Sequence, residues 1–502
     1  MPPEAPPEAP PLLSSDRLDP SRRQTLALAL AAAGAVVADT PSSAATAATV
    51  AGSPVVQASV AVGPAPVGVV GGGFAGLSYE KATVTERLFT AANADLVGLF
   101  RRLGPSLLRL GGNTVERQVW TAGGRGGVPG QIAPADVDAL AGFLKASGWR
   151  CLYGVNLAGA ATNATSPVLA AEEVKYVARA LGSSLAGIEI GNEPDLYGDI
   201  GYFPRSTWNA AAFEALWRRY RDAIVAATPG VTVTGPSTAG SVQRWTAPFA
   251  SAEKGQFEWL THHYYRANGL DPTSTAARLV TPDGALGQML AALKQAGTAA
   301  GTPVRLSECN SFYNGGAHGA SNAYASALWG IDFLFSCAQG GLSGVNFHGG
   351  GQSAYTPIAD HDNAVVGVRP LYYGLALFHL MGSGTLRQTA VYAGGRNVSA
   401  YAITSPSRGL RVVLVNKDPT EDLEVTVYLH RSATRASGVA LTQLSPGASG
   451  PSLTATSGVI LSGAAIGPDG SWTPEAAEAL TVADSQVKVR LPRLSAMLVT
   501  VS

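Results

Sequence analysis

Between residues 70 and 384, short apolar runs alternate regularly with longer amphipathic stretches. Each run ends in polar residues or glycine: FAGLSYE (74–80), SLLRLGGN (106–113), RCLYGVNLA (150–158), LAGIEIGNE (185–193), VTVTGPST (231–238), FEWLTHHYY (257–265), TPVRLSECN (302–310) and LSGVNFHGG (342–350). Apolar runs of strand length separated by helical stretches are typical of βα units. Eight such units predict an α/β fold, a (β/α)8 TIM barrel over residues 70–384, whose active site lies at the C-terminal ends of the strands.

The pattern changes after residue 384. Residues 385–502 contain short segments of alternating apolar and polar residues, separated by Gly, Pro, Ser and Asp: NVSAYAI (397–403), LRVVLVN (410–416), LEVTVYL (423–429), LTATSGVI (453–460) and VKVRLP (487–492). Such a pattern predicts an appended antiparallel β-sandwich domain over residues 385–502. The apolar segment 55–69 is expected to add an N-terminal strand to this sandwich.

The first 54 residues have the composition of a processing segment rather than of a fold. They begin with a proline-rich stretch typical of disordered chains. Arg22 and Arg23 then precede a short apolar run and a stretch of small residues, which together resemble a twin-arginine export signal. The sequence therefore predicts a periplasmic or extracellular protein with no stable membrane association once it is processed. An uncleaved membrane anchor is the alternative.

Composition excludes several classes of function. Charged residues make up only 14% of the 502 residues, and the formal net charge is zero, so no nucleic-acid partner is expected. The three cysteines, Cys151, Cys309 and Cys337, lie in apolar segments without metal-ligand spacing. They are predicted to be buried free thiols, and neither a cofactor nor a metal is expected.

Two glutamates end predicted barrel strands in similar surroundings. Glu193 follows an apolar run in GIEIGNEPDLYG (187–198), and Glu308 follows one in RLSECNSFYNGG (305–316). Because both strands end at the same rim of the barrel, the two carboxylates are predicted to project into one mouth. Cleavage of a glycosidic bond needs such a pair, one to protonate the leaving oxygen and one to attack or to activate water. A separation of about 5–5.5 Å gives retention of configuration and a wider one gives inversion.

The neighbours of the two glutamates suggest different roles. An ionised Glu308 nearby would favour the protonated form of Glu193, the form a general acid needs. Glu308 itself needs hydrogen bonds that keep it ionised, and the tyrosines of HHYY (262–265) could donate one. Glu189 shares a strand face with Glu193, and a pairing of Glu189 with Arg109 is predicted to be structural.

The motifs EIGNEPD (189–195), HHYY (262–265) and SECNSFYNGGAHGASNAYASALW (307–329) resemble glycoside hydrolase family 79, the β-glucuronidase and heparanase family. The likeness covers roughly residues 70–500. It implies a retaining enzyme with Glu193 as acid/base and Glu308 as nucleophile. It further implies that Tyr264 contacts the nucleophile, with the adjacent Tyr265 as the alternative. The resemblance also implies that Tyr313 and Tyr355 bind the carboxylate of the uronic acid. Glu80 and Asn192 would contact the sugar hydroxyls.

The positions of the basic residues limit the class of substrate that is expected. No Lys or Arg lies between Arg305 and Arg369, so the loops expected to line the site offer no cation to a sulfate group. Tyrosine hydroxyls and backbone amides could still hold a single carboxylate in a partly dehydrated pocket. The SECNS segment also departs from the heparanase pattern. The carbohydrate partner expected from these features is a terminal, unsulfated glucuronic acid removed by an exo-acting β-D-glucuronidase.

Two other functions fit parts of the pattern. The chain could be another retaining barrel glycosidase that acts on a neutral sugar, such as an arabinofuranosidase, a xylosidase or a glucosylceramidase-like enzyme. It could also be a non-catalytic carbohydrate-binding protein, although the presence of both glutamates and their tyrosine neighbours speaks against that function.

Overall fold

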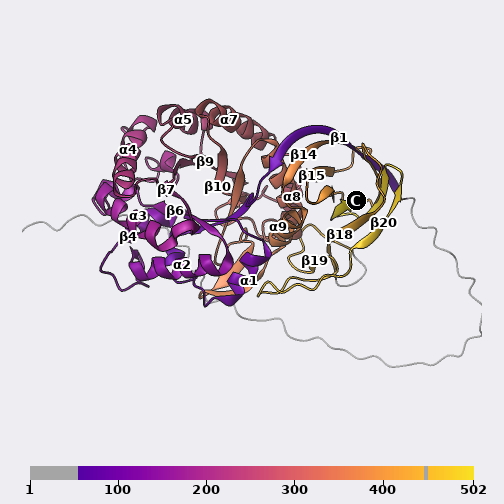
Figure 1. Cartoon of the computed structure of the whole chain (residues 1–502), viewed down its shortest axis with the longest axis horizontal. Helices are drawn as coiled ribbons and strands as arrows, with labels where there is room; N and C mark the ends of the chain where they lie inside the picture. The colour runs from indigo at the N-terminus through magenta and orange to yellow at the C-terminus, as the bar shows by residue number, and fades with distance from the viewer. Residues whose placement is uncertain (1–54, 446–449) are drawn as a thin grey trace, which may run out of the picture. The chain divides into compact units, whose positions relative to one another are not determined.

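A computed structural model describes residues 55–445 and 450–502. The segment that resembles an export signal lies outside these residues. The predicted (β/α)8 barrel is confirmed, because eight parallel strands close on themselves in chain order (Figure 1). They are β2 (Ala75–Glu80), β3 (Leu107–Gly111), β6 (Arg150–Val155), β7 (Leu185–Ile190), β8 (Val233–Thr238), β9 (Trp259–Asn268), β10 (Val304–Tyr313) and β11 (Gly344–Gly349).

Helices surround this barrel, as Figure 1 shows for α2 to α5 and α7. Several of them begin at residues suited to the N-cap: Ser166, Asn209 and Asp283 each accept a hydrogen bond from a backbone amide of the first turn. The helices are α1 (Ala94–Arg102), α2 (Pro134–Ser147), α3 (Pro167–Leu181), α4 (Ala210–Ala227), α5 (Ala247–Ala252), α6 (Ala276–Leu279), α7 (Gly284–Ala300), α8 (Tyr324–Gln339) and α9 (Pro370–Met381).

The predicted β-sandwich domain is also confirmed, with one difference in strand direction. Its strands form a single sheet in the order β19-β18-β20-β21-β17-β1-β14-β15-β16-β22, and an additional pairing of β18 with β22 closes it. The strands are β1 (Val56–Val70), β14 (Gly384–Tyr392), β15 (Val398–Ser405), β16 (Gly409–Asn416), β17 (Leu423–Tyr428), β18 (Ala436–Gln443), β19 (Val459–Leu461), β20 (Glu478–Ala483), β21 (Gln486–Leu491) and β22 (Ser495–Val501). The sheet is mixed rather than antiparallel, because β1 runs parallel to β17 and antiparallel to β14.

The segment 453–460 is not the strand that its sequence predicts. Only its last residues belong to β19, and the preceding ones form a loop against the start of α8. The carbonyls of Leu453 and Ala455 accept hydrogen bonds from the amides of Ala325 and Tyr324, at 2.9 and 2.8 Å. These amides belong to the first turn of α8, where no intrahelical acceptor exists, so the loop caps the helix instead of extending a sheet.

Two short strand pairs lie outside both sheets. These are β4 (Val119–Trp120) with β5 (Gln131–Ile132), and β12 (Ile358–His361) with β13 (Ala364–Val368). Among the helices formed by residues 55–445 and 450–502, none combines the length and hydrophobicity needed to span a bilayer. The C-terminal ends of the barrel strands carry most of the polar residues discussed below, as expected for a TIM barrel.

Candidate active site

A cavity of about 610 Å³ opens at the C-terminal end of the barrel. Most of its lining comes from the ends of the barrel strands and from the loops that follow them. The lining residues are Glu80, Asn113, Glu116, Asn192, Glu193, Leu196, Ile200, Tyr202, Ala239, His263, Tyr265, Glu308, Tyr313, Asn314, Gly315, His348 and Tyr355. Six of the seven residues predicted for the site are in this set, and the seventh, Tyr264, is not.

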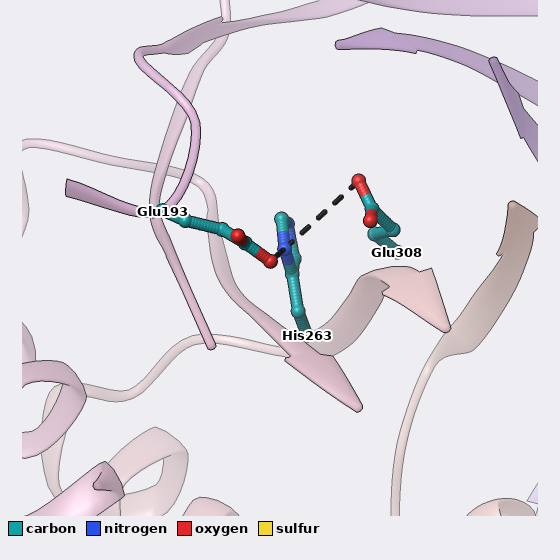
Figure 2. A group of neighbouring side chains, drawn as sticks. All are labelled: Glu193, His263 and Glu308. Atoms are coloured by element: carbon teal, nitrogen blue, oxygen red, sulfur yellow. Dashed lines mark hydrogen bonds and ion pairs between the residues drawn. The ribbon is translucent and has the colours of Figure 1, made fainter. Parts of the chain in front are cut away.

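Glu193 and Glu308 face each other across His263 (Figure 2). One oxygen of each carboxylate and one ring nitrogen of His263 all lie within 4.8 Å of one another. His263 Nδ1 is 2.9 Å from Glu193 Oε1 and 4.0 Å from Glu308 Oε2. An oxygen-to-oxygen separation of at most 4.8 Å is closer to the separation of about 5–5.5 Å that gives retention than to the wider one that gives inversion.

Glu308 is buried and is held in the ionised form by its neighbours. The hydroxyl of Tyr265 donates a hydrogen bond to Oε1 at 2.7 Å, and Arg109 Nη1 donates one to Oε2 at 2.5 Å. Burial alone would raise the pKa of Glu308, but the charges of His348, His263 and Arg109, together with the Tyr265 hydroxyl, lower that pKa below its ordinary value of 4.5. The carboxylate of Glu308 is therefore an anion at neutral pH.

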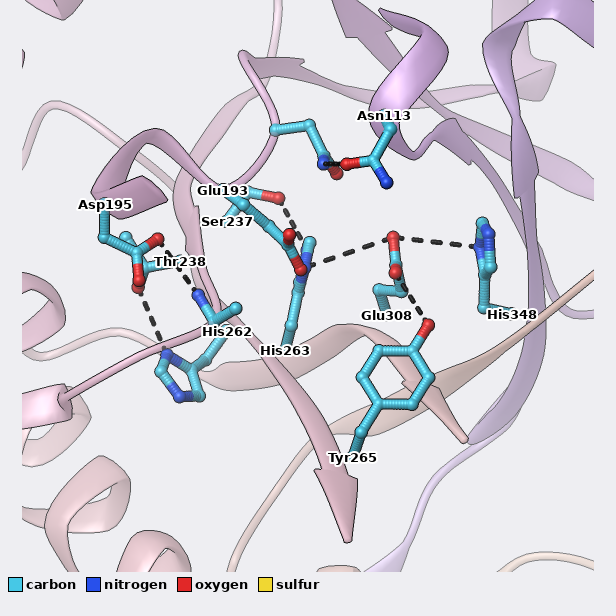
Figure 3. A network of polar contacts seen from close by, with 12 residues as sticks. Asn113, Glu193, Asp195, Ser237, Thr238, His262, His263, Tyr265, Glu308 and His348 are labelled. Atoms are coloured by element: carbon cyan, nitrogen blue, oxygen red, sulfur yellow. Dashed lines mark hydrogen bonds and ion pairs between the residues drawn. The ribbon is translucent and has the colours of Figure 1, made fainter. Parts of the chain in front are cut away.

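His348, at the end of β11, lies on the other side of Glu308 from His263 (Figure 3). Its Nδ1 is 3.7 Å from Glu308 Oε2, and its Nε2 is 3.6 Å from Glu80 Oε1. Burial alone would lower the pKa of His348, but Glu308 and Glu80 raise it. Burial would likewise raise the pKa of Glu80, but His348 and Thr114 lower it. The sequence placed Glu80 in the site. The position of His348 at the end of the eighth predicted strand is compatible with lining the cavity, but its sequence context does not single it out.

The structure contradicts the prediction that Tyr264 contacts Glu308. Successive side chains of a strand point to opposite faces, so His263 and Tyr265 face the barrel interior while Tyr264 faces the surrounding helices. There the Tyr264 ring stacks on Phe333 of α8 with centroids 5.8 Å apart, and its hydroxyl donates to Asp283. The contact to Glu308 comes from the adjacent residue, Tyr265.

Arg109 contacts more than the structural partner predicted for it. Its Nε donates to Glu189 Oε2 at 2.6 Å, as expected, but its Nη1 reaches Glu308 and its Nη2 donates to Asn192 and Ser237. The guanidinium is completely buried. Arg109 therefore links the ends of β3, β7, β8 and β10, and it belongs to the site rather than to the barrel core alone.

The GGN sequence at the end of β3 makes room for these side chains. A Cβ atom on Gly111 would lie 2.4 Å from Arg109 Cζ, and one on Gly112 would lie 2.5 Å from Glu80 Cδ. Gly112 also has φ of +68°, which a residue with a side chain rarely adopts. The two glycines thus leave the space that the side chains of Arg109 and Glu80 occupy.

The backbone at Glu193 has an unusual conformation. Its φ of +49° and ψ of +52° place it in the left-handed region, and its amide donates to the Ser237 carbonyl at 2.8 Å. Non-glycine residues in this region cost free energy and concentrate at functional sites. The Ser237 hydroxyl lies 3.0 Å from Arg109 Nη2 and 2.7 Å from His263 Nε2, so polar contacts run from Arg109 through Ser237 and His263 to Glu193. Figure 3 shows the part of this path from Ser237 to Glu193.

Glu116 is a site residue that sequence reasoning missed. Its carboxylate accepts hydrogen bonds from the amides of Leu157, Ala158 and Asn192, at 2.7 to 2.8 Å, and from the hydroxyl of Tyr197. These contacts join the loops after β3, β6 and β7 and fix the residue next to Glu193. An acidic residue four positions beyond a double glycine was the available signal, but its partners are distant in sequence.

Tyr313 and Tyr355 both line the cavity near Glu308. The ring of Tyr265 lies 6.5 Å from the ring of Tyr313 and 6.1 Å from that of Tyr355. Tyr313 is 44% exposed, whereas Tyr355 is mostly buried, and burial followed by the charge of Glu308 raises the pKa of Tyr355. The Tyr355 hydroxyl therefore stays protonated. Both tyrosines carry an O–H group that can donate a hydrogen bond to an anion.

Glu193, His263 and Glu308 are also residue types that bind divalent metals. Their relevant atoms already have partners in the protein, however. Glu308 accepts from Arg109 and Tyr265, and Glu193 Oε1 lies within hydrogen-bond distance of His263. A cation placed here would compete with the fixed charge of Arg109, so the arrangement favours acid–base and nucleophilic chemistry over metal binding.

No family model matches the chain, but two curated relatives do. A β-glucuronidase of Aspergillus niger is 28% identical over 297 residues, which cover 54% of this chain and 54% of the relative. A β-glucuronidase of Neurospora crassa is 26% identical over 338 residues, which cover 60% of this chain and 59% of the relative. The matches span little more than half the length of these relatives. They confirm the resemblance to β-glucuronidases that the motifs predicted.

Solved structures agree with this fold. A 4-O-α-L-rhamnosyl-β-D-glucuronidase of Fusarium oxysporum aligns with a TM-score of 0.73 and 20% identity, covering 88% of this chain and 100% of that one. A family 51 arabinofuranosidase of Xanthomonas axonopodis pv. citri aligns with a TM-score of 0.62 and 16% identity, covering 89% and 100%. At these identities the likeness establishes the architecture of barrel and sandwich alone.

Proposed function

We propose that this chain is a retaining, exo-acting β-D-glucuronidase that removes terminal, unsulfated glucuronic acid. The observation that carries the proposal is the pair of carboxylates, Glu193 and Glu308, with oxygens within 4.8 Å of each other at the mouth of the barrel. Their environments differ in the way that a double displacement requires. Glu308 is kept ionised by its neighbours, while Glu193 is in contact with His263 and is more accessible to solvent.

In the first step, Glu308 attacks the anomeric carbon while Glu193 gives its proton to the leaving oxygen. The C–O bond to the aglycone breaks and an ester between the sugar and Glu308 forms. In the second step, Glu193 takes a proton from water, which attacks the same carbon and releases Glu308. The hydrogen bonds from Tyr265 and Arg109 orient Glu308 and stabilise it again as it becomes the leaving carboxylate.

Recognition of the uronic acid carboxylate is proposed for the hydroxyls of Tyr313 and Tyr355. Among the described residues that line the cavity, none is Lys or Arg, so a carboxylate would be bound by hydrogen bonds rather than by a direct ion pair. Glu80 and Asn192 lie in the same cavity and are proposed to contact sugar hydroxyls. Glu80 also accepts hydrogen bonds from the amides of Asn113 and Thr114, which fix its orientation.

The names of the two relatives and of the Fusarium structure support glucuronic acid as the sugar. The volume of the cavity lies within the range of small-molecule sites and supports binding of a chain end rather than of a long polymer. The loops that carry Tyr313 and Tyr355 contain no Lys or Arg, so they offer no cation to a sulfate group. This supports an unsulfated substrate. Export through the twin-arginine pathway remains a proposal that depends on Arg22 and Arg23 and on the apolar run after them.

The test is hydrolysis of four aryl glycosides: β-D-glucuronide, β-D-glucoside, β-D-xyloside and α-L-arabinofuranoside. We expect strong preference for the glucuronide, and release of the β-anomer in an NMR time course. Preference for a neutral sugar would keep the carboxylate pair and overturn the tyrosine assignment. Release of the α-anomer would overturn the retaining mechanism, and failure to cleave any of the four, or longer glucuronic-acid-capped glycans, would favour a carbohydrate-binding protein.

A further inference from the structure

Beyond Glu193 the cavity is bounded by uncharged side chains, which we call the leaving-group wall: Leu196, Ile200, Tyr202 and Ala239. Ile200 is 57% exposed, although isoleucine is usually buried. The other three are half-buried. The wall is therefore an apolar surface that faces the cavity without being covered by the rest of the described chain.

The two loops that carry the wall, one after β7 and one after β8, are held in place by the protein itself. The amide of Leu196 donates to the Glu193 carbonyl, that of Ile200 to the Leu196 carbonyl and that of Tyr202 to the Tyr197 carbonyl, at 2.9 to 3.0 Å. The carboxylate of Asp195 accepts from the amides of Ala239 and Gly240. Since these bonds form without a ligand, binding against the wall would cost little ordering of the loops.

The four residues of the wall carry no charge. Asp195 is occupied by the two backbone amides, and the nearby Arg205 pairs with Asp199 at 3.0 Å, with its side chain 82% exposed to solvent. Glu308 and His348 lie on one side of Glu193 and Asp195 lies on the other (Figure 3), and Glu80 is paired with His348. The cavity is thus polar where the sugar is proposed to bind and apolar beyond the proposed acid.

We infer that the leaving-group wall selects an uncharged aglycone with an extended apolar surface, of the aryl or alicyclic class. The inference rests on the proposed function, because Glu193 marks the leaving-group side only if it protonates the glycosidic oxygen. That oxygen joins the sugar to the aglycone, so an aglycone must extend past Glu193 and contact the residues next to it. An anionic or sulfated aglycone would find no cation among the four wall residues, whereas an apolar one would cover Ile200 and Tyr202.

The test compares methyl and cyclohexylmethyl β-D-glucuronide. Both leaving groups are simple alcohols of similar acidity. A difference in kcat/KM therefore measures contact between the aglycone and the protein rather than a difference in leaving-group ability. We expect the cyclohexylmethyl compound to be cleaved with a kcat/KM at least about tenfold higher, because several methylene groups leave water. Ile200→Ser should lower this ratio severalfold. Leu270→Ser removes another exposed apolar side chain, one that does not line the cavity, and should leave the ratio unchanged.

The possible results distinguish failure of this inference from failure of the proposed function. Equal kcat/KM for the two glucuronides, or a higher kcat/KM for a glucuronide of neutral galactose than for the cyclohexylmethyl compound, would overturn the inference while the glucuronidase activity stands. An unchanged ratio in Ile200→Ser would overturn the role of the wall. If the enzyme cleaves only a neutral glycone, the proposed function fails, and the same pair of alcohols attached to that glycone then tests the wall.

Discussion

The hydroxyl of Tyr265 lies 2.7 Å from Oε1 of Glu308, at the point where β9 and β10 run side by side. Its neighbour Tyr264 points to the opposite face of β9 and bonds to Asp283 between the barrel and its helices. The two adjacent tyrosines therefore form a matched pair, one at the carboxylate and one outside the cavity.

Tyr265→Phe is expected to lower kcat by roughly 10- to 100-fold, because a hydrogen bond to a charged group is worth about 1.5–3 kcal/mol. Tyr264→Phe, the matched control, should keep kcat near the wild-type value and lower only thermal stability. Steady-state kinetics and thermal unfolding of both variants provide the measurement. Equal kcat losses in the two variants would contradict the assignment of Tyr265 to the nucleophile.

Glu308→Gln is expected to reduce kcat by at least about a thousandfold, because the amide cannot form the ester intermediate. Glu193→Gln should cost about 10² to 10⁴ on alkyl glucuronides. It should cost much less on dinitrophenyl glucuronide, whose leaving group needs little protonation. Glu258→Gln, an exposed glutamate, serves as the control and should be close to wild type. Residual activity of Glu308→Gln within about tenfold of wild type would refute its role as nucleophile.

Much of the fold could be predicted because its signals are local. Each barrel strand is a short apolar run with polar residues at its end, and a parallel barrel brings those ends to one rim. This rule alone predicted that Glu193 and Glu308 lie close together. It could not determine which of Tyr264 and Tyr265 faces inward, since both are aromatic and their pairing with β10 contains a register shift between Leu306 and Glu308. A slip of one residue exchanges the two faces of a strand.

The contacts that escaped prediction join residues distant in sequence. Arg109 donates a hydrogen bond to Glu308 across the barrel interior, and Glu116 accepts hydrogen bonds from backbone amides of two other loops. In the sandwich, the parallel pairing of β1 with β17 depends on where the N-terminal segment returns to the sheet, which alternation of apolar residues does not encode. The loop 453–460 has the alternation of a strand, yet it caps α8.

Arg109→Met is expected to lower the free energy of unfolding by about 3–5 kcal/mol, because it leaves the buried carboxylates of Glu189 and Glu308 without their cation. Arg244→Met removes an exposed arginine and should change stability by less than about 0.5 kcal/mol. Denaturant unfolding of both variants measures the difference. A loss of activity in Arg109→Met without a loss of stability would show that the buried network does not hold the barrel strands together.

Tyr313→Phe and Tyr355→Phe are each expected to lower the preference for glucuronide over glucoside by roughly tenfold, the value of one hydrogen bond to a carboxylate. The ratio of kcat/KM for the two aryl glycosides is the measurement, because it cancels effects on folding. Tyr428→Phe changes an exposed tyrosine of the sandwich and should not alter the ratio. Unchanged ratios in both site variants would remove these tyrosines from carboxylate recognition.

His348→Gln should shift the dependence of activity on pH. The charge of His348 lowers the pKa of Glu308, so its loss raises that pKa toward the ordinary value. The ionised nucleophile is then lost earlier as pH falls, and the acid limb of kcat/KM moves to higher pH. His361→Gln, which changes a histidine with a 71% exposed side chain, should leave the limb in place. An unmoved acid limb in His348→Gln would show that His348 does not act on Glu308.

The same variant makes a prediction for stability. The folded pKa of His348 is raised, so its contribution is complete below the ordinary value of 6.5 and is lost as pH rises through the folded pKa. The folded pKa of Glu80 is lowered, so its contribution is complete above 4.5 and is lost as pH falls through its folded pKa. The difference in free energy of unfolding between wild type and His348→Gln should therefore be largest between pH 4.5 and pH 6.5 and should decline toward alkaline pH. Urea unfolding across this range measures it, and a difference that grows at alkaline pH would mean that His348 is not a cation in the folded protein.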